Sequence, residues 1–117
     1  MRFDLKNHGL HRVLKPWHAE IMRCIWEKEE SNSRKVWDHL QGLDDPELRK
    51  SRAAVIGGLN QMVFEGLLGF REEPGKGGYH KVYYPVHENE GVFRNWLAIK
   101  IRGEVLSFLE EYEEEEE

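Results

Sequence analysis

Apolar positions recur at helical spacing directly after Pro16. The apolar side chains of this stretch follow one another at steps of four, one, three and one: Trp17, Ile21, Met22, Ile25 and Trp26. This spacing is typical of a helix with one buried face. Proline suits the first turn of a helix, where its missing N–H is not needed. We therefore expect a helix over about residues 16–29.

Two shorter helices are predicted next. The first helix of the two has three candidate N-cap residues, Ser31-Asn32-Ser33, of which we favour Ser33. It would end at Gly42, and its buried side would carry Val36, Trp37 and Leu40. A turn at Asp44-Asp45-Pro46 follows. Ser51 is the next N-cap, and the helix after it ends at Gly66. Its buried face would carry Val55, Leu59, Met62 and Val63.

The pattern then changes to that of a β-hairpin. Residues 67–73 and 79–85 are expected to be strands. In the second strand, Tyr79, Lys81 and Tyr83 would lie on one face and the residues between them on the other. The intervening Pro74–Gly78 segment, rich in glycine, is expected to be a loop. After Pro85 the helical spacing returns over residues 88–112, and the helix is too apolar to stay single in water. The five glutamates of 113–117 would repel one another and fray.

This order of elements predicts a mainly α protein with a small β-hairpin (α+β), a winged helix-turn-helix with a long C-terminal dimerisation helix. The expected organisation is an N-terminal arm at 1–15, a DNA-binding domain at 16–87, the dimerisation helix at 88–112 and an acidic tail at 113–117. The arm is either extended or a short extra element, which would contact the DNA backbone through Arg2, Lys6, Arg12 and Lys15 or pack on the long helix. We favour packing.

Composition narrows the class of protein. The chain has 117 residues, of which 39% are hydrophobic and 33% charged, and a single cysteine, Cys24. One cysteine excludes an internal disulfide and a four-cysteine zinc site. No apolar run approaches the length of a membrane span, and the first residues lead into no secretory signal. We expect a cytoplasmic protein without membrane partners.

The net charge of −5 is unevenly distributed. Residues 1–87 hold 14 Lys and Arg against 12 Asp and Glu, a net +2, whereas residues 88–117 hold 3 against 10, a net −7. Residues 49–81 carry six basic and three acidic side chains. A local excess of positive charge of this kind attracts a nucleic acid, whatever the net charge of the whole chain.

Several stretches resemble a known family. Ala19-Glu20-Ile21-Met22 followed by Ile25-Trp26 is similar to the opening of the penicillinase-repressor superfamily, which includes the methicillin-resistance and copper-transport repressors. Ser33–Leu40 and Ser51–Leu68 resemble its second helix and its recognition helix. Ser51–Ile56, Gly75–His80 and Tyr83-Tyr84-Pro85 look closer still to its archaeal winged-helix regulators. The resemblance covers about residues 16–112 and implies a homodimeric DNA-binding repressor. The cysteine-rich metal motif of the copper-responsive members is absent from this sequence.

The helix after Ser51 is the predicted recognition helix. Its outward positions would be Arg52, Ala53, Ile56, Gly57, Asn60 and Gln61. Asparagine and glutamine pair with adenine, and arginine pairs with guanine. The flanking hairpin would grip the DNA backbone or the minor groove. The predicted DNA-binding residues are Lys50, Ser51, Arg52, Ala53, Gly57, Asn60, Gln61, Arg71, Lys76, Gly77, His80 and Lys81.

Gly57 and Gly58 are unusual in a helix, where each costs about 1 kcal/mol relative to alanine. Two explanations remain open. A bare surface allows the helix backbone to approach DNA, or Gly58 packs closely against another helix. The string Gly75–Gly78 does not match a nucleotide-binding phosphate loop, since the required pattern and the following helix are missing.

The predicted dimerisation residues form the apolar stripe of the long helix: Phe93, Trp96, Leu97, Ile101, Val105 and Phe108. Among the six histidines, only His8 and His11 lie close together in the sequence, and they fall in a segment without regular spacing, so no metal site is expected. Cys24 is expected to be a buried hydrophobic residue. No catalytic arrangement and no cofactor pattern is present, and no enzymatic activity is expected.

The leading hypothesis is a homodimeric regulator that binds double-stranded DNA and represses transcription, with an effector of unidentified chemistry. The alternative is a winged-helix protein-interaction module that recruits a different protein through its long helix, without specific DNA binding. A weaker third reading is RNA binding, for which exposed aromatic platforms are expected but not recognised in the sequence.

Overall fold

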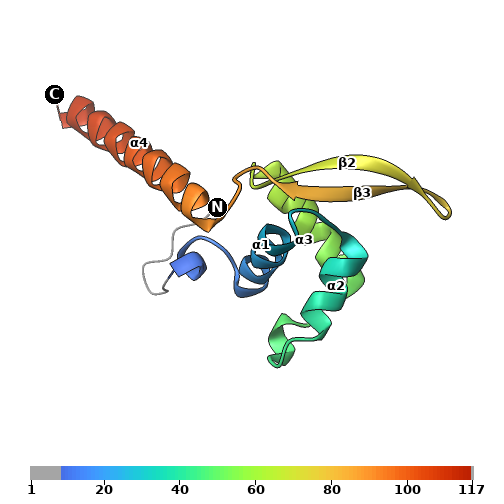
Figure 1. Cartoon of the computed structure of the whole chain (residues 1–117). Coiled ribbons are helices and arrows are strands. Elements are labelled where there is room, and N and C mark those ends of the chain that lie inside the picture. The colour runs from blue at the N-terminus through green and yellow to red at the C-terminus, as the bar shows by residue number, and fades with distance from the viewer. Residues whose placement is uncertain (1–8, 117) are drawn as a thin grey trace. The chain divides into compact units, whose positions relative to one another are not determined.

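The computed structural model describes residues 9–116, with all side chains in that range except those of Arg12 and residues 113–116 (Figure 1). The chain divides into two compact units, the first ending at His87 and the second beginning at Glu88. The first unit holds three helices and a three-stranded antiparallel sheet, and the second is one long helix. The predicted fold class, a winged helix-turn-helix followed by a long C-terminal helix, is confirmed.

The three helices of the first unit are α1 (Pro16–Lys28), α2 (Ser33–Gln41) and α3 (Arg52–Phe64). Pro16 is the first residue of α1, as expected. Ser51 caps α3, because its hydroxyl oxygen accepts a hydrogen bond from the Ala54 N–H at 3.1 Å. The prediction that Ser33 caps α2 is wrong. Asn32 does so through its Oδ1, which accepts from the Lys35 N–H at 2.9 Å, and Ser33 is already helical.

The sheet has the order β1–β3–β2, so β3 (Gly78–Pro85) is its central strand. β2 (Leu68–Gly75) pairs with β3 along its whole length, from Leu68 opposite Pro85 to Gly75 opposite Gly78. The expected five-residue loop is therefore wrong, since only Lys76 and Gly77 connect the strands. A positive φ of 82° at Gly77 fits the third residue of a type II turn, which favours glycine.

Two short elements were not predicted. β1 (Ser31–Asn32) pairs with β3 through Ser31 opposite Tyr83, and a 3₁₀ turn, η2 (Pro46–Leu48), follows α2. The hairpin of β2 and β3 extends away from the three helices as a wing (Figure 1). Near the end of β3, the indole N–H of Trp26 donates to the carbonyl oxygen of His87 at 2.8 Å. This bond ties the end of the wing back to α1.

One core unites the helices and the sheet. Its fully buried members include Ile21, Met22 and Ile25 from α1, Val36 and Leu40 from α2, Val55, Leu59 and Met62 from α3, and Leu67, Leu68 and Tyr83 from the sheet region. The helical members are among the positions that the helical spacing placed inward. Four other positions placed inward are only partly buried: Trp17, Trp26, Trp37 and Val63. Burial of such side chains is the main stabilising contribution to the fold.

The N-terminal arm is described only from Gly9, so Arg2, Lys6 and His8 lie outside the described residues. Gly9–Arg12 form a 3₁₀ helix, η1, and Leu10 and Leu14 are buried. The described part of the arm is thus a short packed element rather than an extended strand of chain. It contacts α1.

The second unit is α4 (Glu90–Glu116). Asn89 precedes it and accepts a hydrogen bond from the Val92 N–H at 2.9 Å through its side chain. The helix was expected to end at residue 112 and to fray beyond it; instead, the backbone remains helical through Glu116. Across residues 9–116, none of the helices combines the length and the apolar character that crossing a membrane requires.

Candidate nucleic-acid interface

α3 divides into a buried and an exposed face. Val55, Gly58, Leu59 and Met62 are buried, whereas all six positions that the sequence placed outward are exposed. They are Arg52, Ala53, Ile56, Gly57, Asn60 and Gln61. One further residue, Phe64, lies on the same face one turn after Asn60 and is 87% exposed. This surface, from Ala53 to Phe64, is called the α3 face below.

Side-chain contacts fix the start of α3 against α2. The Gln41 amide nitrogen donates to the Lys50 carbonyl oxygen at 2.8 Å, which holds the turn that precedes the cap. The Arg52 guanidinium lies 3.4 Å from the Ser33 hydroxyl and 5.9 Å from the centre of the Trp37 ring. These contacts orient Arg52 toward α2. The Lys50 ammonium lies 5.8 Å from the centre of the Trp17 ring.

The two amides of the α3 face are held differently. The Tyr83 hydroxyl, on β3, donates to Asn60 Oδ1 at 3.0 Å, which joins the wing to this face. The amide nitrogen of Gln61 instead donates to Glu65 Oε1 at 3.0 Å, one turn along the helix. Asn60 therefore presents its NH₂ group with its oxygen anchored. Burial raises the pKa of Tyr83, so its hydroxyl remains a donor at neutral pH.

The two adjacent glycines of α3 have opposite surroundings. A Cβ added to Gly58 would lie 2.7 Å from two ring atoms of Trp17 and 3.2 Å from His18 Nε2, so Gly58 serves close packing of α3 on α1. A Cβ added to Gly57 would meet nothing within 4 Å. Of the two explanations left open, packing accounts for Gly58, and a bare helix surface describes Gly57.

Arg71, the first predicted cation of the wing, is engaged by two carboxylates. Its guanidinium lies 2.6 Å from Glu30 and 2.8 Å from Glu73. Hydrogen bonds to Glu30 and then to Glu73 raise the pKa of Arg71, and the pKa of Glu30 is lowered by the same pairing. Arg71 thus connects β2 to the segment that follows α1, and its positive charge lies next to two negatively charged carboxylates.

The remaining wing candidates are exposed or partly exposed. Lys76 lies at the turn and makes no ion pair with any described residue, and Gly77 is exposed beside it. The His80 ring lies over Gly75, where an added Cβ would be 2.8 Å from Nδ1. The Lys81 ammonium lies 4.5 Å from the centre of the Phe70 ring. Lys76 is therefore the most available cation of the described wing.

The wing also exposes aromatic rings. Tyr79, next to the turn, is 76% exposed, and Phe70 and Tyr84 are each exposed on the strands. These exposed rings of the wing were not identified from the sequence. The rings are divided between the two sheet faces, because Phe70 and Tyr79 lie on one face and Tyr84 on the other.

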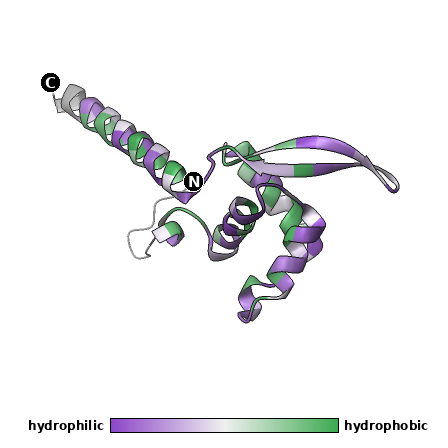
Figure 2. Ribbon diagram, viewed as in Figure 1, coloured by the Kyte–Doolittle hydropathy of each residue, from purple (hydrophilic) through white to green (hydrophobic). Residues whose placement is uncertain are grey.

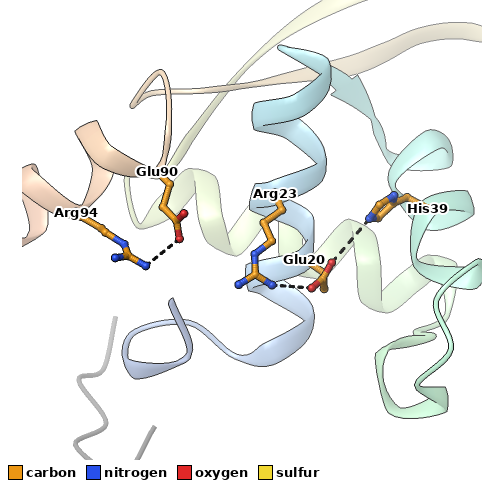
Figure 3. A network of polar contacts seen from close by, with 5 residues as sticks. All are labelled: Glu20, Arg23, His39, Glu90 and Arg94. Atoms are coloured by element: carbon orange, nitrogen blue, oxygen red, sulfur yellow. Dashed lines mark hydrogen bonds and ion pairs between the residues drawn. The ribbon is translucent and has the colours of Figure 1, made fainter. Parts of the chain in front are cut away.

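Three polar contacts lie away from the α3 face: one joins α1 to α2, one lies along α1 and one lies along α4. Glu20 of α1 accepts from Arg23 at 2.8 Å and lies 3.9 Å from His39 Nε2 of α2, with Arg23 and His39 on either side of it in Figure 3. Glu90 and Arg94 form a separate pair along α4 at 3.2 Å. These exposed pairs stabilise the helices weakly.

α4 exposes much of its predicted apolar stripe. Phe93 is buried; Trp96, Leu97 and Ile101 are partly exposed; Val105 and Phe108 are exposed. Apolar segments recur along the helix in Figure 2. The exposed surface is extended by side chains outside the predicted set: Val92, Ile99, Leu106, Leu109 and Tyr112.

The metal-ligating residue types are dispersed over the part of the chain that the structure describes. Among the described residues, no three His, Cys, Asp or Glu side chains are grouped as a metal ion requires. Cys24 is buried, as expected, and burial raises the pKa of its thiol.

Sequence reasoning missed three parts of this interface. The exposure of Phe64 depends on where α3 ends relative to the sheet. The anchoring of Asn60 by Tyr83 and the engagement of Arg71 by Glu30 join residues that are 23 and 41 positions apart. No local pattern in the sequence indicates such pairs.

Fold and surface together define a winged-helix protein with an exposed third helix. No protein-family model and no curated protein matches the sequence. Among solved structures, the chain is similar to Stf76 from the Sulfolobus islandicus plasmid-virus pSSVx. The TM-score is 0.49 and the identity 11%, over 68% of this chain and 92% of that one. The resemblance to the penicillinase-repressor superfamily stays a prediction.

Proposed function

We propose that the chain is a homodimeric transcription regulator, a repressor, that binds double-stranded DNA in the cytoplasm and has no enzymatic activity. α3 enters the major groove, and the wing contacts the backbone or the minor groove. The observation that carries this proposal is the α3 face: a capped helix, packed firmly on one side, leaves two amides and a bare glycine exposed on the other.

The geometry of α3 suits a groove. The major groove admits one α-helix, and side-chain amides there pair with base edges. The start of α3 adds positive charge through Lys50 and Arg52, and the N-terminal end of a helix favours phosphate. At the wing, Lys76 supplies a cation at the turn. Occupancy of the DNA by such a protein blocks access of polymerase.

The apolar surface of α4 supports the dimeric part of the proposal. Ile101, Val105, Phe108 and Tyr112 follow one another at steps of four, three and four, the spacing of a coiled-coil seam. A single helix with such a surface is stabilised by a second copy that covers it. Two-fold symmetry then predicts a pseudo-palindromic operator.

The same exposed surface favours a second candidate function. If α4 binds a different protein, the chain is an interaction module that does not depend on DNA. The two functions differ in their response to salt, because a protein that contacts several phosphates loses affinity with a log–log slope of about −0.9 per phosphate.

The test is a fluorescence-anisotropy titration of labelled duplex DNA at about 50 and about 200 mM salt. The proposal predicts salt-sensitive binding that Asn60→Ala weakens. Asn95→Ala is the matched control, because Asn95 is an exposed asparagine of α4. Equal affinity of the two variants would remove Asn60 from the interface. A folded dimer that does not bind at low salt would favour the interaction module.

A further inference from the structure

The α3 face carries no charged side chain. Its exposed residues are all apolar or neutral: Ala53, Ile56, Gly57, Asn60, Gln61 and Phe64. The nearest cation of the helix, Arg52, lies at its start, where the guanidinium is directed to Ser33 and Trp37 of α2. Guanine is most often read by a cationic side chain that bonds both O6 and N7. The middle turns of α3 have no side chain of this kind.

Ile56 is the branched apolar residue in the middle turns of this face. It is 39% exposed and is followed by Gly57, which has open space where a Cβ would lie. The branched side chain of Ile56 therefore lies next to a position of the helix surface that carries no side chain. The one apolar group that a base edge presents in the major groove is the C5 methyl of thymine.

Asn60 adds a polar group one turn further along. With Oδ1 accepting the Tyr83 hydroxyl, its amide nitrogen points to no partner among the described residues. An amide donor fits the N7 of either purine, the O6 of guanine or the O4 of thymine, so on its own it does not select a base pair. Ile56 and Asn60 lie at i and i+4, side by side on the helix surface. Of the two, only Ile56 can distinguish thymine, through its methyl group, and the donor of Asn60 is compatible with an A·T pair beside it.

We propose that Ile56 is a specificity-determining residue that packs against a thymine methyl group, so that the DNA bound by each α3 contains an A·T pair there. The inference rests on the proposed function, because it requires α3 to lie in the major groove. Burying one methyl group raises affinity about fourfold, and a two-fold dimer with two such contacts gains about fifteenfold.

The test compares a duplex selected by the wild-type chain from a random pool with the same duplex in which deoxyuridine replaces thymine. Deoxyuridine keeps the base pairing and lacks only the methyl group. We expect wild-type affinity to fall about fifteenfold when both half-sites are changed. Ile56→Ser should bind the two duplexes equally, whereas Ile56→Val should retain most of the preference.

Val86→Ser is the matched control, because Val86 is an exposed apolar residue outside α3. It should preserve the preference for thymine. Salt-sensitive binding that is indifferent to deoxyuridine would overturn this inference and leave the proposed function intact. An unchanged thymine preference in Ile56→Ser would overturn the role of Ile56. Absence of DNA binding would overturn the proposed function and this inference with it.

Discussion

The α1–α3 contact contains a buried histidine whose ionisation opposes folding. The His18 ring meets the Trp17 ring edge to face, with centroids 4.2 Å apart, beside Gly58. Burial, and then the positive charge of Lys15, lower the pKa of His18 from its ordinary 6.5, while Glu65 opposes the shift. The folded chain therefore holds His18 in its neutral form.

This shift predicts a loss of stability in acid. Because the pKa of His18 is lower in the folded chain, the unfolded chain takes up the proton first as the pH falls. The contribution of His18 is fully present above pH 6.5 and is lost as the pH falls from there through the folded-state pKa. Between about pH 7.5 and about pH 5.5, the free energy of unfolding measured in urea should fall less for His18→Gln than for the wild type.

Burial also lowers the pKa of His87, so some pH dependence should remain in the variant. If the free energy of unfolding changed equally between the two pH values in His18→Gln and in the wild type, His18 would contribute nothing to the pH dependence of stability. The burial of His18 was not predicted from the sequence, because a histidine next to Trp17 fits either face of a helix. Its burial follows from the missing side chain at Gly58, on another helix.

At the scale of the elements, helices were predictable and short pairings were not. The spacing of apolar residues predicted all four helices to within a few residues, because each carries its apolar side chains along one side. β1 has two residues, too few for any periodicity. Pro74 and Gly75 suggested a loop, yet they continue the ladder opposite Tyr79 and Gly78. Proline is tolerated there because β2 lies at the edge of the sheet.

The exposed face of α3 was equally predictable, because the buried positions define its opposite side. The environment of each exposed side chain was not. The Tyr83–Asn60 bond and the ion pairs of Arg71 depend on how the wing lies against the helices. The sequence therefore indicates which residues are available on α3, and the fold decides which of their polar groups remain available.

Gly57 provides a test in which stability and binding move in opposite directions. Gly57→Ala should stabilise the chain by about 1 kcal/mol, because the added Cβ meets no atom and alanine favours the helix. The same methyl group should weaken DNA binding if the helix backbone approaches the groove closely at this position. Urea unfolding and a DNA titration measure the two effects.

The control is Gly103→Ala, since Gly103 lies within α4 and also has open space around its Cβ position. It should stabilise the helix by a similar amount and leave DNA affinity unchanged. Wild-type affinity in Gly57→Ala would mean that the groove does not approach the α3 backbone at this residue.

At the scale of the whole molecule, charge is distributed unevenly between the two units. The acidic residues of 88–117 would repel DNA, and the net positive charge lies in residues 1–87. This division favours DNA contact by the winged-helix unit and self-association by α4. The apolar surface of α4 was visible in the sequence, but which of its residues remain exposed was not.

Phe108 tests the proposed dimer without disturbing the winged-helix unit. It is 64% exposed, so Phe108→Glu removes no core side chain. Loss of one large buried side chain costs about 2–3 kcal/mol, and a two-fold dimer loses it twice, so dimerisation should weaken at least about 100-fold. Sedimentation equilibrium measures the change.

Ser107→Glu introduces the same charge at the neighbouring exposed position of α4. It should leave the dimer nearly unchanged, because Ser107 lies outside the apolar seam. A Phe108→Glu chain that dimerises like the wild type would place the self-association surface elsewhere. A wild-type chain that is monomeric at high concentration would contradict the dimer itself.

The most direct test of the central claim is selection from a random pool of duplex DNA by the full-length chain, followed by sequencing of the bound fraction. A homodimeric winged-helix regulator predicts enrichment of an inverted repeat, with half-site centres about one helical turn, 10–10.5 base pairs, or a multiple of it apart. Binding without any enriched sequence, or no binding by a folded dimer, would contradict sequence-specific DNA recognition by α3.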